Sequence, residues 1–306
     1  MTSPFGPLVI IANPRAGRGK VERQLPAIER VLADAGLEYR IVRTTHPGHA
    51  TEAAREALHG GERYLVAAGG DGTVHEVVNG MFVRGEPVAA GAVLGVVAAG
   101  SGCDIVRSLS LPGDAVRASH HLAGDAIRDL DLGKITFRAG SSEVSRYFAN
   151  IAEAGLGAAV VARAAGLPRF LGPAKYLCGF WLSLPGFHAS AVRVTADGQS
   201  YEWRAHNVVV ANCRFYGGGM HISPKSEPDD GVLDALVMVG PKSDAFTMLP
   251  KIYAGAHLPH RNIVELRAGR VLLEADPPVR IEADGEILGT TPATFEAVPK
   301  AIRVKV

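Results

Sequence analysis

The chain has 306 residues, of which 47% are hydrophobic and 21% are charged, as in an ordinary soluble globular protein. Its 32 basic and 31 acidic residues give a formal net charge of +1. This balance argues against a nucleic-acid-binding domain and against a polybasic anchor for anionic membranes, and the length is sufficient for two domains.

The lack of a membrane-spanning run and of a signal peptide, together with the cysteine spacing, predicts a cytoplasmic protein. The longest apolar run, residues 87–100, is too short to span a bilayer and is broken by glycines. The opening stretch MTSPFGPLVIIANP lacks the basic region of a signal peptide. Cys103, Cys178 and Cys213 are an odd number of widely spaced cysteines, which form neither a disulfide framework nor a CxxC metal motif.

The first hundred residues alternate between strand and helix patterns. Apolar strands are expected at 8–13, 38–44, 63–70 and 92–100, and helices at 20–36, 50–60 and 73–85. This alternation predicts a parallel sheet covered by helices on both faces. Such sheets bind ligands beyond the carboxyl ends of their strands, which is where NPRAG (13–17), GGDGT (69–73) and GSGCD (100–104) lie.

After about residue 131 the pattern becomes one of alternating or apolar strands joined by Gly, Asp and Ser turns. It predicts a mainly β domain, a sandwich, with a helical insert near 157–184. Within this insert, Leu177, Phe180, Trp181 and Leu184 share one helical face. Core packing is favoured for that face over an acyl-chain pocket.

GGDGT is the most informative motif. A glycine turn before a helix directs backbone N–H groups and the positive end of the helix dipole at an anion. Asp71 would repel a bare phosphate, so a divalent cation is expected beside it. The alternative is a tight strand-to-helix turn capped by Thr73. Walker A and GxGxxG motifs are absent, which argues against a P-loop enzyme and a Rossmann dehydrogenase.

Six stretches resemble, in order, the motifs of the diacylglycerol kinase-like lipid kinases: NPRAG, GGDGTVHEVVNG, AAGSGCDIVRSLSLP, DLDLGKI, GGGMHISPKSEPDDGVLDALVM and RIEADGE. That family includes soluble bacterial diacylglycerol kinases and the related sphingosine and ceramide kinases. GGDGT alone is shared with NAD kinases and phosphofructokinases, whereas PDDG and DGE give the specificity.

The resemblance implies an α/β plus β fold. A Rossmann-like ATP-binding domain would comprise residues 1–131 plus about 292–306, because the C-terminal tail of the family returns to the first domain. A β-sandwich lipid-binding domain would comprise residues 132–291. In the family, ATP and lipid meet in the cleft between the domains.

The resemblance also implies site residues. The nucleotide-binding positions fall on Asn13, Thr44, Gly69, Gly70, Asp71, Gly72, Thr73, Val74, His75, Glu76, Gly100, Ser101, Gly102 and Asp104. Ser101, Cys103 and His75 stand where the family usually has threonine, asparagine and asparagine.

A structural magnesium site falls on the Asp230 side chain with the backbone carbonyls of Glu227 and Val232. The alternative is a purely structural role, in which EPDDG is a β-turn before a strand. Asp284 and Glu286 are the candidates for the catalytic base, Asp284 for orienting the site and Glu286 for abstracting the proton. Asp71 would hold the catalytic magnesium through water. ADGE also reads as a plain hairpin turn.

The expected function is ATP- and magnesium-dependent phosphorylation of a lipid hydroxyl, with diacylglycerol as the leading acceptor and phosphatidic acid as its product. A sphingoid or other lipid kinase and an NAD kinase-like enzyme remain as alternatives. A non-catalytic lipid or nucleotide sensor is disfavoured because the acidic residues of the motifs are all present. The expected partner is a lipid at the membrane surface, contacted during catalysis, and a homodimer is left open.

Overall fold

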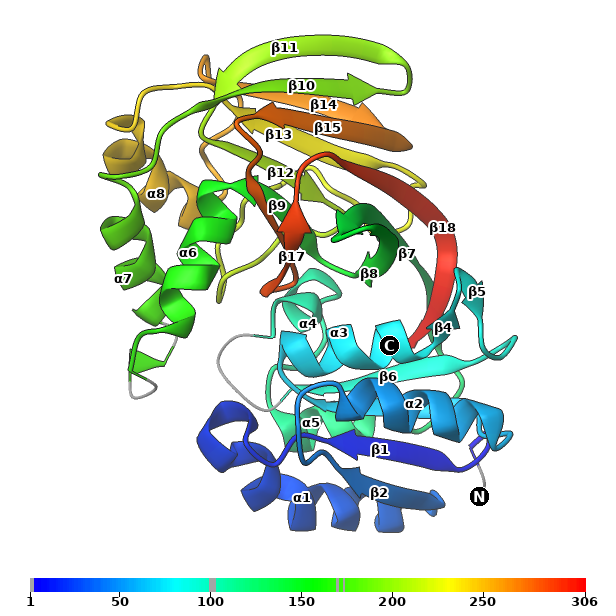
Figure 1. Ribbon diagram of the computed structural model, residues 1–306. Coiled ribbons are helices and arrows are strands. Elements are labelled where there is room, and N and C mark those ends of the chain that lie inside the picture. Colours follow the sequence, from blue (N-terminus) through cyan, green and yellow to red (C-terminus); the bar gives the residue numbers. More distant parts are fainter. Residues whose placement is uncertain (1–2, 99–102, 169–170, 173) are drawn as a thin grey trace. The chain divides into compact units, whose positions relative to one another are not determined.

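The computed structural model describes residues 3–98, 103–168, 171–172 and 174–306 (Figure 1). The chain forms two compact units: Met1–Leu130 with Lys300–Val306, and Asp131–Pro299. The functional-domain boundaries expected from the sequence stay a prediction. Within the described ranges, no helix combines the length and the apolar character needed to cross a bilayer.

A parallel sheet forms the centre of the first unit. Its strands, in spatial order, are β6 (Val93–Ala98), β3 (Tyr64–Gly69), β1 (Leu8–Ala12) and β2 (Tyr39–Arg43). The last part of β18 (Ala293–Lys305) pairs in parallel with β6, with Arg303 opposite Val93. Strands β1, β3 and β6 are buried along their whole length, as expected for a sheet covered on both faces. The predicted parallel sheet and returning tail are confirmed.

Helices follow the strands of this unit. They are α1 (Ala16–Asp34), α2 (His49–His59), α3 (Asp71–Gly80), α4 (Asp104–Ser108) and α5 (Ala115–His120). In α1 an i, i+3, i+4 series buries Val21, Leu25, Ile28 and Leu32 against the sheet. Gly36 then adopts a φ of +66°, and the Leu37 N–H donates to the Leu32 carbonyl, which closes the helix as a glycine C-cap does.

The helix expected at 73–85 is shorter than the prediction. It ends at Gly80, and a small hairpin of β4 (Phe82–Val83) and β5 (Glu86–Pro87) follows. Arg84 and Gly85 have φ angles of +53° and +90°, which a helix does not allow. The apolar spacing of Phe82 and Val83 continued the helical pattern and concealed this turn.

The second unit contains two sheets. One has the order β14 (Ile263–Ala268), β13 (Leu233–Met238), β12 (Asn207–Ala211), β9 (Ile151–Gly155), β16 (Arg280–Ala283) and β17 (Glu286–Thr290), with neighbours antiparallel. The other has the order β11 (Gln199–Ala205), β10 (Ser190–Ala196), β15 (Arg270–Asp276), β18, β7 (Ile127–Ala139) and β8 (Ser142–Phe148).

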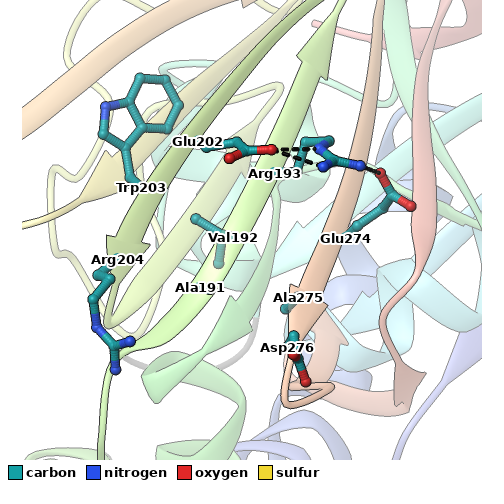
Figure 2. Close-up of a pocket in the computed structure, with 9 residues that line it drawn as sticks. All are labelled: Ala191, Val192, Arg193, Glu202, Trp203, Arg204, Glu274, Ala275 and Asp276. Atoms are coloured by element: carbon teal, nitrogen blue, oxygen red, sulfur yellow. Dashed lines mark hydrogen bonds and ion pairs between the residues drawn. The ribbon is translucent and has the colours of Figure 1, made fainter.

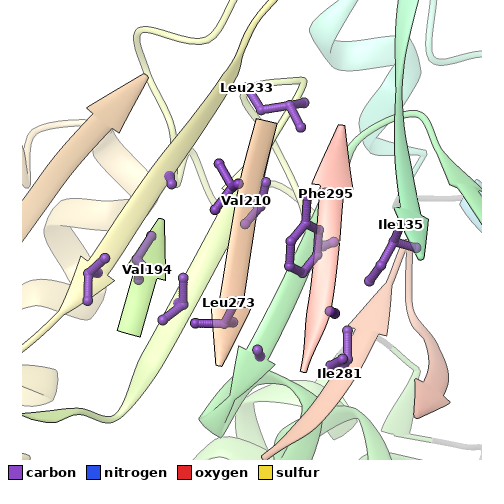
Figure 3. Packing of buried hydrophobic residues seen from close by; sticks show 14 of the residues in the cluster. Ile135, Val194, Val210, Leu233, Leu273, Ile281 and Phe295 are labelled. Carbon is purple, nitrogen blue, oxygen red and sulfur yellow. The ribbon is translucent and has the colours of Figure 1, made fainter. Parts of the chain in front are cut away.

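Apolar side chains from both sheets fill the space between them. Figure 3 shows Ile135, Val194 and Phe295 from one sheet facing Val210, Leu233 and Ile281 from the other. Along β10, buried and more exposed residues alternate, as the period of a half-buried strand requires. The predicted β-sandwich is therefore confirmed.

The helices of the second unit are α6 (Leu156–Ala165), α7 (Ala174–Ser183) and α8 (Asp244–Ala254). The first two form the predicted insert. Leu184 is buried, but Leu177 is 43% exposed, so core packing was the wrong reading for much of this apolar face. Helix α8 was not predicted. Its Met248 and Ile252 pack on the sheet face that lies away from the sandwich core.

Candidate functional site

The parallel strands of the first unit end together. Ala12 of β1 lies opposite both Arg43 of β2 and Ala68 of β3, and Gly69 lies opposite Ala98 of β6. Three of the predicted nucleotide-binding residues, Asn13, Thr44 and Gly70, directly follow these strands and share this edge. Gly100, Ser101 and Gly102 lie outside the described residues.

The GGDGT turn leaves open space at two glycines. A Cβ on Gly69 would overlap Thr73 Oγ1, so that glycine allows close packing of the turn. Among the residues that the structure describes, a Cβ on Gly70 or Gly72 would instead meet nothing within 4 Å. Helix α3 begins here, at Asp71. Because the first amides of a helix lack intrahelical acceptors, this open space fits a phosphate group.

Asp71 connects this turn to the next one. Its Oδ1 accepts hydrogen bonds from the N–H groups of Asp104 at 2.8 Å and Ile105 at 3.3 Å, at the start of α4. The buried Asp104 carboxylate is paired with Arg107. Cys103 is also buried, and burial, followed by the Asp71 charge, raises the pKa of its thiol. Asp71 therefore has a structural contact besides its predicted role with magnesium.

The remaining residues of the motif point into the protein. Thr73, Val74 and His75 are buried, and the His75 Nε2 lies 3.3 Å from the Asn79 amide nitrogen. Glu76 Oε2 accepts from the Ala50 N–H at 3.0 Å, in the first turn of α2. These contacts explain why the residues suit the fold. Their roles in nucleotide binding stay predictions.

The ADGE segment is a tight turn between β16 and β17. Asp284 and Gly285 have φ angles of +48° and +88°. The Asp284 carboxylate accepts from the N–H of Ala149 at 2.9 Å, and from those of Asn150 and Ile151, each at 3.1 Å. It thereby fixes the turn to the start of β9. Glu286, the first residue of β17, is exposed.

Sequence reasoning missed two buried carboxyl groups beside this turn. Glu282 of β16 lies opposite Glu153 of β9, with 2% and 1% exposure. Burial raises the pKa of both side chains, and the neighbouring Glu153 raises that of Glu282 further. The signal was present in NIAEAG and RIEA, where a glutamate interrupts an otherwise apolar strand.

Both oxygens of the Asp230 carboxylate have protein partners. Its Oδ2 is paired with Arg267, and its Oδ1 accepts from the Val232 N–H at 3.1 Å. Across the described residues, no three His, Cys, Asp or Glu side chains gather as a metal site. This geometry resembles the β-turn alternative. The magnesium site on Asp230 and the carbonyls of Glu227 and Val232 stays a prediction.

A pocket of about 680 Å³ lies on β10, β11 and β15. Figure 2 shows Arg193 at its centre, between Glu202 and Glu274. None of the predicted site residues lines it. Because Arg193, Glu202 and Glu274 place charged groups at its centre, the pocket does not suit an acyl chain.

Two family models match the chain. The diacylglycerol kinase catalytic domain matches residues 7–135, and the YegS C-terminal NAD kinase beta sandwich-like domain matches residues 150–306. A diacylglycerol kinase of Bacillus subtilis (strain 168) is 28% identical over 298 residues, which cover 96% of this chain and 94% of that protein.

Solved structures share the fold. A diacylglycerol kinase from Bacillus anthracis str. Sterne, 24% identical, has a TM-score of 0.75 and covers 99% of this chain and 97% of its own. Yeast NADH kinase, 11% identical, has a TM-score of 0.50 and covers 97% and 82%. The chain thus belongs to the diacylglycerol kinase-like lipid kinase family and is a lipid kinase.

Proposed function

We propose that this enzyme transfers the γ-phosphoryl group of ATP to the hydroxyl of diacylglycerol, giving phosphatidic acid. The observation that carries the nucleotide part is the open space at Gly70 and Gly72, beside the first turn of α3. A phosphate there would receive backbone N–H groups and the positive end of the helix dipole. Family membership supports the lipid part.

The residues at the strand ends would hold the nucleotide. Asn13 and Thr44 would flank it, and Asp71 would orient the metal through water. Magnesium, when bound with ATP, neutralises the negative charge of the phosphates and of the transferring group. Asp71 suits this role because it is held in place by the N–H groups of Asp104 and Ile105.

Glu286 is the proposed base, and Asp284 a positioning residue. Both Asp284 oxygens already accept backbone hydrogen bonds, whereas Glu286 is exposed beyond the turn that Asp284 fixes. Glu286 would take the proton of the acceptor hydroxyl as that oxygen bonds to the γ-phosphorus. The bond from that phosphorus to the bridging oxygen breaks, and ADP leaves.

Apolar side chains on α7 and α8 support a lipid acceptor over a soluble one. Leu177, Leu182 and Phe246 are 43%, 54% and 67% exposed, and the rings of Trp181 and Phe246 lie 4.8 Å apart. We call these four residues the α7–α8 patch. Exposed apolar side chains on two helices that contact each other can form a contact site for a membrane or a partner. We assign it to the membrane surface that supplies the substrate.

The test is acceptor labelling. The purified protein is incubated with γ-labelled ATP, magnesium and separate micelles of diacylglycerol, sphingosine, ceramide and monoacylglycerol, or with free NAD. We expect labelled phosphatidic acid and no label on NAD. Label on another lipid would replace diacylglycerol as the substrate, and label on NAD alone would overturn the lipid assignment.

The base has its own test. Glu286→Gln should lower kcat by about 10²–10⁴-fold with little change in the KM for ATP, because the amide cannot accept the proton. The matched control is Glu202→Gln, which changes an exposed carboxylate on β11 in the same way. Near-normal kcat of Glu286→Gln on the labelled acceptor would place the base elsewhere.

A further inference from the structure

Glu153 and Glu282 lie on the outer face of a sandwich sheet. Their strand neighbours Ala152, Ala154 and Ile281 belong to the core between the sheets. Because side chains alternate between the two faces of a strand, both glutamates point to the face away from that core. Opposite residues of antiparallel strands have Cβ atoms about 4.5–5.5 Å apart. The two carboxyl groups are therefore direct neighbours, away from water.

Each carboxyl group has fixed partners. Glu153 Oε1 accepts from the Asn207 side-chain amide at 3.0 Å, and Glu153 also receives the Tyr216 hydroxyl. A Cβ on Gly157 would overlap Glu153 Oε2, so the first turn of α6 lies directly against this oxygen. Glu282 Oε2 accepts from the Gly285 N–H at 2.8 Å, inside the turn that precedes Glu286.

The described residues place no positive charge in contact with the pair. In the part of the chain that the structure describes, no lysine, arginine or histidine bonds to either carboxyl group. The turn contributes the acidic groups Asp284 and Glu286. Tyr216 adds a hydroxyl, with Tyr253 of α8 beside it, and α6 has no titratable side chain before Arg163.

Two adjacent buried carboxylates without a cation repel each other strongly, so one of them keeps a proton near neutral pH. The other can remain ionised. Glu282 accepts the Gly285 N–H through its Oε2, and the one proton of the pair lies between the two side chains. This shared proton removes the repulsion that would push Glu282 away from its place.

We propose that Glu153 and Glu282 share one proton and act together as positioning residues for the Asp284–Gly285–Glu286 turn. The proposal rests on the assignment of Glu286 as the base. Loss of the shared proton at alkaline pH places two like charges at opposite strand positions. The Gly285 contact weakens, Glu286 moves from its working position, and kcat falls while nucleotide binding does not change.

The first test is the pH profile of kcat, measured on whichever lipid is labelled. Wild-type kcat should fall on the alkaline side. Glu153→Gln, a neutral residue that still donates a hydrogen bond, should keep kcat near neutral pH and shift the fall upward by at least about one pH unit. Glu153→Leu should lower kcat at least tenfold at every pH, with the KM for ATP unchanged. Asp244→Asn, a half-buried carboxyl of α8 bonded to Asn262, is the control and should follow wild type.

The second test needs no activity. A carboxyl group whose native pKa is raised binds its proton more tightly in the folded state. Its contribution is therefore fully favourable below the unfolded pKa of about 4.3 and is lost as pH rises through the native value. The melting temperature of wild type should decline over this range, and that of Glu153→Gln should decline less.

The two tests separate the pair from the kinase assignment. If no lipid is labelled, the proposed function fails, and the melting curves still decide whether the pair shares a proton. The proposal that the pair shares a proton would be wrong if wild type and Glu153→Gln had the same pH profile of kcat. It would also be wrong if their melting temperatures changed with pH in the same way. Full activity of Glu153→Leu would overturn its positioning role.

Discussion

Asp71 combines two functions that different substitutions separate. Its Oδ1 caps the start of α4, and its charge would orient the metal in the proposed reaction. An asparagine can still accept the two hydrogen bonds, but it has no charge. An alanine loses both. The pair of variants therefore distinguishes a folding defect from a chemical one.

We expect Asp71→Asn and Asp71→Ala each to lower kcat by at least about 10²-fold, because the metal loses its charged partner. Asp71→Ala should also lose about 1 kcal/mol of stability from the missing cap, whereas Asp71→Asn should lose little. Steady-state kinetics and thermal unfolding measure the two effects. Full activity of a folded Asp71→Asn would remove the GGDGT turn from the nucleotide site.

Asp230 gives a second prediction at a single side chain. Its pairing with Arg267 predicts that magnesium alone leaves the melting temperature of wild type unchanged. Asp230→Asn should cost at most about 1 kcal/mol, because the Arg267 side chain is 56% exposed and the pair is screened by water. A magnesium-dependent rise in the melting temperature of wild type that Asp230→Asn abolishes would support the structural-ion hypothesis instead.

The α7–α8 patch belongs to two helices, and its prediction concerns both. The double variant Leu182→Gln/Phe246→Gln should bind phospholipid vesicles at least tenfold more weakly, because burying one large apolar side chain is worth about 1.5–3 kcal/mol. Activity on a short-chain, monomeric diacylglycerol should not change. Val83→Gln, at a position 37% exposed in the first unit, is the control. Unchanged vesicle sedimentation of the double variant would contradict the assignment.

The elements that the sequence predicted well are those with local signals. The apolar runs and glycine turns around GGDGT determine both the strands and the edge on which Asn13, Thr44 and Gly70 meet. Helix α8 was missed because Pro250 interrupts its pattern. The Glu153–Glu282 pair could not be predicted, because the strand register that brings β9 against β16 is set by long-range packing and not by either segment alone.

For the whole molecule, stability should depend on pH with opposite slopes in the two units. Burial and the nearby Lys305 lower the pKa of His121, in the first unit, to about 4. The unfolded chain binds the proton with a pKa of about 6.5, so the first unit should lose stability as pH falls from about 6.5 to 4. The second unit, with Glu153 and Glu282, should instead lose stability as pH rises.

The tryptophans allow this to be measured. Trp181 and Trp203, the only two in the chain, both lie in the second unit. Their fluorescence follows that unit alone, while circular dichroism follows both. His121→Gln should flatten the acid side of the dichroism curve and leave the fluorescence curve unchanged. If His121→Gln does not alter the loss of stability at acid pH, that loss comes from another titratable group.

The end of β18 also constrains the order of events on the ribosome. Strand β6 lies at the edge of the first unit's sheet until Arg303 and Val304 pair with it, and residues 131–299 are synthesised in between. At about 5–20 residues per second, that interval lasts roughly 10–30 s. During this time the nascent chain exposes an unpaired edge of the apolar strand VLGVVA, of the kind that recruits other strands. A nascent chain stalled before residue 300 should therefore be more protease-sensitive and more dependent on chaperones than one released after it.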